Sequence, residues 1–183
     1  MGLPALQIED LPHYTYDDYV NWEGRWELIH GIPYAMAPAP AIRHQEISGE
    51  IAVQLHKLLA HCKLCKPLLP VDWQIAEDTI VQPDNLVVCG ENIEGKKLTI
   101  TPVLVFEILS PSTGRKDRVL KYRLYREAGV KYFCIVNPEI KSAEAFTLKS
   151  SEYEKTEDFQ DGKVTFDLGP CKIAFDFNEI FKK

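Results

Sequence analysis

The segment at 103–109 constrains this fold more than any other part of the chain. Its seven residues, Val-Leu-Val-Phe-Glu-Ile-Leu, are apolar except for Glu107. A strand of this composition is typical of a sheet that is covered on both faces. Strand alternation places Glu107 on the same face as Val105 and Leu109. Because an unpaired buried carboxylate costs several kcal/mol, we expect Glu107 to have a cation, a metal ion or a proton beside it.

The flanking segments predict an α/β (α+β mixed) fold. Helical spacing of apolar residues indicates one helix at 43–61 and a second at about 114–128, which ends at Gly129. A hairpin is expected over 26–34. Further strands are expected at 71–75, 79–88, 131–136, 143–148, 152–156, 163–167 and 171–177. These elements predict a central mixed β-sheet flanked by helices, with antiparallel C-terminal strands.

Composition predicts a single domain. The chain of 183 residues has no repeat or long polar linker, so we expect an N-terminal helix and strap at 1–25, a core at 26–140 and β additions at 141–183. A net charge of -6 excludes a globally basic nucleic-acid coat, although not a local basic patch. No segment is apolar enough to span a membrane, and the N-terminus lacks a signal-peptide pattern. The five cysteines predict reduced thiols in a cytoplasmic protein.

Two further charged residues interrupt apolar patterns. Asp84 lies within the expected strand at 79–88, and Lys121 falls on the apolar face of the second helix, between Ala128 and Tyr125 on the helical wheel. Taken singly, each has a simpler explanation: a structural ion pair, a strand end that reaches water, or a lysine that extends past the helix edge. Taken together with Glu107, they predict a charged cluster at the end of a sheet.

Such a cluster contains the groups required for metal-assisted phosphodiester hydrolysis. Carboxylate oxygens from Asp84 and Glu107 suit Mg²⁺. The metal polarises the phosphate and lowers the pKa of the attacking water. A lysine near that water can orient it, help to deprotonate it and offset negative charge in the transition state.

The same segments resemble a known nuclease family. Pro83-Asp84, followed after 22 residues by Glu107, is similar to the PD-(D/E)XK signature of restriction-endonuclease-like nucleases. The resemblance is closer still to the Uma-type family of putative restriction endonucleases, and it extends over residues 26–31, 81–84, 107–113, 121–125 and 132–136. It implies a restriction-endonuclease-like fold and a DNA endonuclease that uses Mg²⁺ or Mn²⁺. Asp84 and Glu107 would bind the metal, with the backbone carbonyl of Ile108 as a further ligand.

The lysine departs from the superfamily pattern. That pattern has lysine two residues after the acid, where this chain has Leu109. In the Uma-type family the lysine lies on the following helix, and Lys121 is the matching residue. The alternative is a catalytically weak or inactive nuclease-fold module that binds nucleic acid, and hydrolysis of a smaller phosphoester is a third, weaker option.

Three other residues are candidates near the substrate. Glu27 matches the acid of the family's Glu-Leu-Ile segment, which implies a place in the metal site or directly beside it, although an exposed hairpin charge explains it equally well. His44 is in helical phase with Ile51, so it faces inward and could contact phosphate, or it could be a satisfied buried histidine. Ser110 could cap the second helix or hold a phosphate at its start.

Arg115, Lys116 and Arg118 begin the densest basic stretch of the chain. It predicts contacts to the backbone of duplex DNA, although a solvated helix face has the same pattern. The superfamily resemblance also implies a possible homodimer.

The spacing of Cys62-Lys63-Leu64-Cys65 is compatible with a zinc or redox site. Zinc needs two more ligands, and the remaining cysteines are scattered through predicted strands. The sequence therefore favours ordinary structural cysteines.

Overall fold

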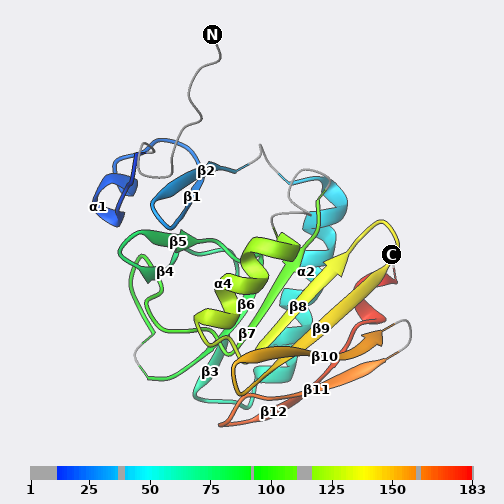
Figure 1. The fold of residues 1–183 in the computed structure, drawn as a ribbon. Coiled ribbons are helices and arrows are strands. Elements are labelled where there is room, and N and C mark those ends of the chain that lie inside the picture. Colours follow the sequence, from blue (N-terminus) through cyan, green and yellow to red (C-terminus); the bar gives the residue numbers. More distant parts are fainter. Residues whose placement is uncertain (1–11, 37–39, 92, 111–116, 160–161, 183) are drawn as a thin grey trace.

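The computed structural model describes residues 12–36, 40–91, 93–110, 117–159 and 162–182 (Figure 1). Its centre is a six-stranded mixed sheet with the order β10-β9-β8-β7-β6-β3. Among these strands β7 and β8 pair in parallel, and their other pairings are antiparallel. The six strands are β3 (Cys65–Leu68), β6 (Asn85–Cys89), β7 (Leu104–Ile108), β8 (Tyr132–Asn137), β9 (Ser142–Lys149) and β10 (Glu152–Phe159).

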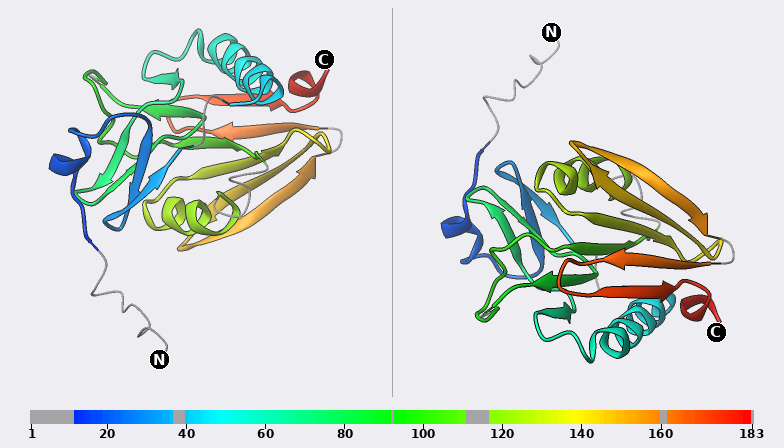
Figure 2. Two further views of the ribbon diagram at one scale, coloured as in Figure 1. Left: turned by 90° about the horizontal axis from the view of Figure 1, so that it is seen from above. Right: turned by 90° about the horizontal axis from the view of Figure 1, so that it is seen from below.

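Both faces of the central sheet are covered (Figure 2). Helix α2 (Ile42–Leu59) and the ribbon of β11 (Lys163–Asp167) and β12 (Lys172–Asp176) cover one face. Helix α4 (Tyr122–Glu127) covers the other face. All five residues of β7 are consequently buried, as the apolar composition of residues 103–109 predicts.

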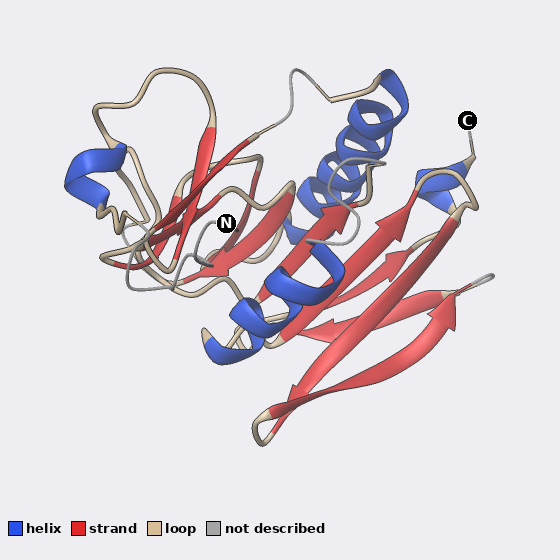
Figure 3. Cartoon of the chain, turned by 45° about the horizontal axis from the view of Figure 1, so that its top comes forward, coloured by secondary structure: helices blue, strands red, loops and turns tan. Residues whose placement is uncertain are grey.

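A second sheet of four short strands lies beside the central sheet (Figure 3). Its order is β2-β1-β5-β4. The predicted hairpin is present as β1 and β2, and its turn residues His30 and Gly31 have φ values of 51° and 73°. Positive φ at both central residues is the geometry that a two-residue hairpin turn requires. The four strands are β1 (Trp26–Ile29), β2 (Ile32–Ala35), β4 (Trp73–Ala76) and β5 (Thr79–Val81), and the short helix α1 (Tyr16–Tyr19) precedes them.

The prediction of one strand at 79–88 is wrong. The chain leaves β5 of the small sheet at Val81 and enters β6 of the central sheet at Asn85. Pro83 lies in the break, where it has no N–H to contribute to a strand ladder. Strand β3 was not expected from the sequence, because it is short and contains Pro67.

The second predicted helix begins, within the described residues, as the π-helical turn η2 (Asp117–Lys121) and continues as α4. It ends before Gly129, whose φ is 80°. The chain closes with the 3₁₀ turn η3 (Glu179–Phe181). The fold class is therefore the predicted one, mixed α and β with a central mixed sheet and antiparallel C-terminal strands. Within the described ranges, no helix has the length and hydropathy that crossing a bilayer would require.

Candidate active site

Lys121 is buried at the end of η2, and its ammonium group contacts two carboxylates. Its Nζ atom lies 2.9 Å from Oε1 of Glu107 and 3.0 Å from Oε1 of Glu27. The three side chains are only 2–4% exposed. These residues come from η2, β7 and β1, so the ion triad joins a helix to both sheets. The lysine does not extend past the helix edge, and Glu27 is not an exposed hairpin charge.

Tyr125 is a further member of this cluster. Its hydroxyl donates a hydrogen bond of 2.5 Å to Oε1 of Glu107. The ring is fully buried against Trp73 and Phe133. Burial and the negative charge of Glu107 raise the pKa of Tyr125 well above 10, so the hydroxyl remains a donor at neutral pH. The sequence placed Tyr125 on the inward face but gave it no role; the available signal was its spacing of four residues from Lys121.

Glu27 is held in place by the segment that connects β5 to β6. The backbone N–H of Gln82 donates to Oε1 of Glu27 at 3.1 Å. The Gln82 side chain is itself fixed, because its amide donates to Asp72 at 2.6 Å and accepts from Arg25 at 2.9 Å. This network positions the two residues before Asp84 as well as the carboxylate of Glu27.

Asp84 lies directly beside the end of β7. Its Oδ2 atom accepts a hydrogen bond of 2.8 Å from the backbone N–H of Ile108, the residue after Glu107. The same oxygen lies 3.3 Å from Nε2 of His44 in the first turn of α2. The Asp84 side chain is 20% exposed, so it reaches solvent, unlike the three side chains of the triad.

The register between β6 and β7 explains how Pro83 and Asp84 shape this edge. Strand β6 begins at Asn85, opposite Phe106, and beyond this pair the Asp84 side chain accepts the N–H of Ile108. In an extended strand the N–H and C=O of one residue point to the same neighbour. The carbonyl of Ile108 therefore points to the side of Asp84, and Pro83 has no N–H to donate to it. The Pro-Asp pair therefore ends the ladder at this edge of the sheet.

The remaining predicted residues have different outcomes. His44 contacts Asp84, and its side chain is 13% exposed. Ser110 is half-buried directly after β7. Arg115 and Lys116 lie outside the described residues, and Arg118 is placed on η2 without a described side chain. The structure therefore does not test the predicted DNA-backbone contacts.

The donor set at this edge fits a hard divalent cation. This edge has three carboxylates, from Asp84, Glu107 and Glu27, and one ammonium group, from Lys121. The formal charge of these four groups is therefore -2. Oxygen ligands and excess negative charge are what Mg²⁺ and Mn²⁺ require.

The fold is that of a mixed α/β protein with a central sheet covered on both faces. Its fold matches a crystal structure described as a putative nuclease belonging to DUF820 from Anabaena variabilis ATCC 29413. The TM-score is 0.75, the identity is 18%, and the match covers 92% of this chain and 97% of that chain. The family model described as "Uma2: Putative restriction endonuclease" matches residues 11–168, so the chain belongs to that family. A search of curated proteins found no match.

Proposed function

We propose that this protein is a Mg²⁺-dependent endonuclease that hydrolyses phosphodiester bonds in DNA. The family and the nuclease-like fold support a nuclease. The observation that carries the proposal is the buried ammonium of Lys121, held 2.9 Å from Glu107 at the strand end where Asp84 also lies. A stability role alone does not require a lysine in this place, because apolar residues often replace buried ion pairs without loss of stability.

Asp84, Glu107 and the Ile108 carbonyl would hold the ion. When bound, Mg²⁺ polarises the scissile phosphate and lowers the pKa of the attacking water. Mn²⁺ has similar ligand preferences and would substitute for it.

The residues of the chain supply positioning and charge. The Lys121 ammonium would orient the attacking water and offset negative charge on the phosphate oxygens in the transition state. Tyr125 and Glu27 restrain the positions of Glu107 and Lys121 through the contacts described above. His44 contacts Asp84 and would contact a substrate phosphate at the partly exposed side of the site.

DNA would be held by local contacts to its backbone. The net charge of -6 provides no general attraction for a polyanion. Arg115, Lys116 and Arg118 lie between the end of β7 and Lys121 in the chain, and we assign them to phosphate contacts. Binding would then be strongly weakened by salt and only weakly dependent on sequence.

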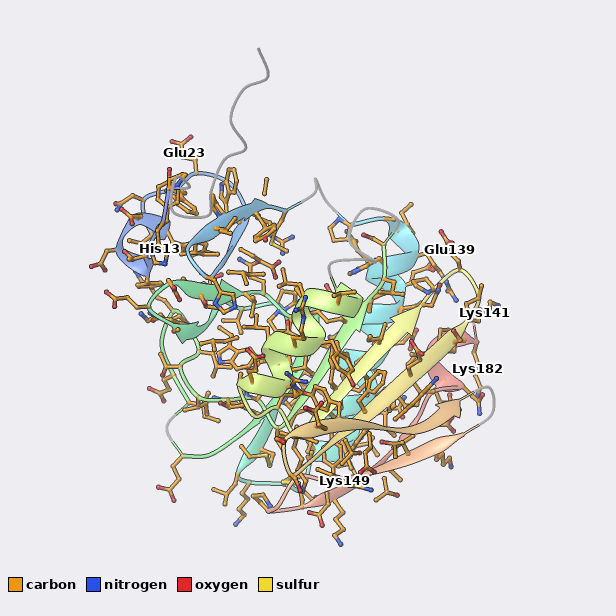
Figure 4. The ribbon with its side chains drawn as sticks, in the orientation of Figure 1. His13, Glu23, Glu139, Lys141, Lys149 and Lys182 are labelled. Carbon is orange, nitrogen blue, oxygen red and sulfur yellow. A yellow bond between two sulfur atoms is a disulfide. The ribbon has the colours of Figure 1, made fainter. Side chains whose placement is uncertain are left out.

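A plasmid cleavage assay with Mg²⁺ or Mn²⁺ tests the proposal. Asp84→Asn, Glu107→Gln and Lys121→Met should each reduce the cleavage rate on the order of 100-fold or more. Lys149→Met is the matched control, because Lys149 is exposed at the far end of the molecule from His13 and the small sheet (Figure 4). Equal cleavage by the wild type and all three site variants would overturn the assignment.

A further inference from the structure

Four of the five cysteines converge at the C-terminal end of α2. Cys62 follows this helix, Cys65 begins β3, Cys89 ends β6, and Cys171 lies in the turn before β12. The Sγ atoms of Cys62, Cys65 and Cys171 all lie within 4.8 Å of one another. The sulfur atoms are joined in two disulfides, Cys62–Cys171 and Cys65–Cys89.

This arrangement corrects the expectation of scattered, reduced cysteines. Strands β3 and β6 pair in antiparallel register with Cys65 opposite Cys89. The β11–β12 ribbon packs against α2 and thereby brings Cys171 to Cys62, although 109 residues separate them in the chain. Among the cysteines, which all lie in described segments, Cys134 alone is free, and it is buried within β8.

We propose that the four clustered cysteines bind one Zn²⁺ ion after a thiol reductant has opened the two disulfides. Each disulfide takes two electrons from two reductant thiols, which leave as a new disulfide, and becomes two cysteine thiols. The four thiols then lose four protons as their sulfur atoms bind the ion. The proposal does not rest on the nuclease assignment.

The geometry of the cluster is close to that of a four-cysteine zinc site. Zn–S bonds of about 2.3 Å in a tetrahedron place the sulfur atoms roughly 3.8 Å apart. Three of the sulfur atoms already lie within 4.8 Å of one another, and the fourth is bonded to one of them. Opening the disulfides and rotating the side chains is therefore enough to approach a tetrahedron. Cys62 and Cys65 also have the two-residue separation that structural zinc sites commonly use.

Three lysines near the cluster can offset part of the charge of an anionic zinc–thiolate group. One Zn²⁺ ion with four thiolates has a formal charge of -2. Lys63, Lys66 and Lys172 are sequence neighbours of the cysteines, and each is exposed. A hollow of about 360 Å³ beside the cluster is lined by Cys65, Lys63 and Lys66 and also by Glu91 and Glu94.

The cluster is separate from the candidate active site. His44 lies in the first turn of α2, and Cys62 lies just beyond its last turn. A helix of 18 residues is about 27 Å long, so the two sites are at opposite ends of α2. A zinc ion there would join α2, the β3–β6 edge and the β11–β12 ribbon, which is a structural role rather than a catalytic one.

Cobalt titration of the reduced full-length protein tests the proposal. Reduced wild type should bind one Co²⁺ per chain with the thiolate charge-transfer and visible bands of tetrahedral sulfur coordination. Zn²⁺ should displace the cobalt and be retained in equal amount by elemental analysis. Cys62→Ser and Cys171→Ser should lose these bands, whereas Cys134→Ser, the matched control, should keep them.

A histidine variant keeps the test decisive if a serine variant does not fold. Cys171→His retains a zinc ligand, so it should keep tetrahedral binding with bands moved to higher energy. Reduced wild type without thiolate–cobalt bands would overturn the proposal. Cobalt bands of equal strength and position in Cys171→Ser, or their absence from a folded Cys171→His, would also overturn it.

Discussion

Lys121 has surroundings that are unusual for a lysine. Its ammonium group is nearly excluded from water, and two carboxylates less than 3.1 Å away compensate its charge. Removing water from a charge costs several kcal/mol, and only close, well-oriented partners offset that cost. The three charges therefore depend on one another, and the removal of one should affect the stability of the whole protein.

Lys121→Met should destabilise the protein by about 3–5 kcal/mol, because Glu27 and Glu107 would remain buried without their shared cation. Urea unfolding measures this change, and Lys149→Met should alter the free energy of unfolding by no more than about 0.5 kcal/mol. Adding Glu27→Gln to Lys121→Met should restore part of the loss. A Lys121→Met variant as stable as the wild type would show that the triad is not closed in solution.

Tyr125 gives the stability a specific dependence on alkaline pH. Burial raises the pKa of Tyr125 in the folded protein above its value of about 10 in the unfolded chain. The stabilisation that the protonated Tyr125 hydroxyl gives to the folded protein is therefore fully present below pH 10. It is lost as the pH rises toward the pKa of Tyr125 in the folded state. Tyr125→Phe should cost about 1.5–3 kcal/mol near neutral pH, because a hydrogen bond to a charged group is lost.

Above pH 10 the difference in unfolding free energy between the wild type and Tyr125→Phe should narrow by about 1.4 kcal/mol per pH unit. Tyr19 and Tyr153 also have raised pKa values, but they contribute equally to both proteins. Denaturant unfolding at several pH values between neutral and alkaline measures the difference. Parallel curves would mean that Tyr125 titrates normally in the folded state.

At the scale of the elements, apolar periodicity was a good guide to the long, regular segments. Helix α2 and strands β7 and β8 are present close to their predicted bounds, because each has a continuous buried face. The break between β5 and β6 was not predicted, because apolar residues lie on both sides of Gln82-Pro83-Asp84 and their pattern does not show that the chain changes sheet there. The π-helical turn at Lys121 was also unexpected. Helical periodicity nevertheless predicted correctly that the Lys121 side chain points inward.

The hairpin that carries Glu27 depends on Gly31. This residue has a φ of 73°, and a Cβ atom added to it would lie 2.2 Å from the His13 ring. Gly31→Ala should therefore destabilise the protein by more than the roughly 1–2 kcal/mol of backbone strain alone. Gly49→Ala is the matched control: this site in α2 has open space, so alanine should stabilise the helix by about 0.5–1 kcal/mol. Thermal unfolding of both variants checks the prediction, and equal melting temperatures would contradict it.

At the scale of the whole molecule, the site exists because two sheets and two helices meet at one strand end. The sequence could indicate Asp84, Glu107 and Lys121, since each interrupts an apolar pattern. It could not decide whether Glu27 was buried, because that depends on how the small sheet packs beside the central one. The sequence could not predict that four cysteines come together, for a similar reason. Their proximity depends on the pairing of β3 with β6 and on the packing of the β11–β12 ribbon against α2.

The excess negative charge of the site predicts that a divalent cation stabilises the folded protein. A ligand that binds only the folded state adds about 2.7 kcal/mol at a concentration 100 times its Kd. Mg²⁺ or Mn²⁺ should therefore raise the melting temperature. KCl at the same ionic strength should not raise the melting temperature. It screens surface charges as the divalent salts do, but it does not supply a divalent cation for the site.

Asp84→Asn should abolish the specific part of this shift, since Asp84 is the carboxylate on the partly exposed side of the site. Lys149→Met should keep it in full. The measurement requires no DNA and no turnover, so it separates metal binding from catalysis. A shift that persists in Asp84→Asn would place the cation elsewhere on the protein, whereas its loss together with retained folding would tie the ion to the edge where β6 and β7 end.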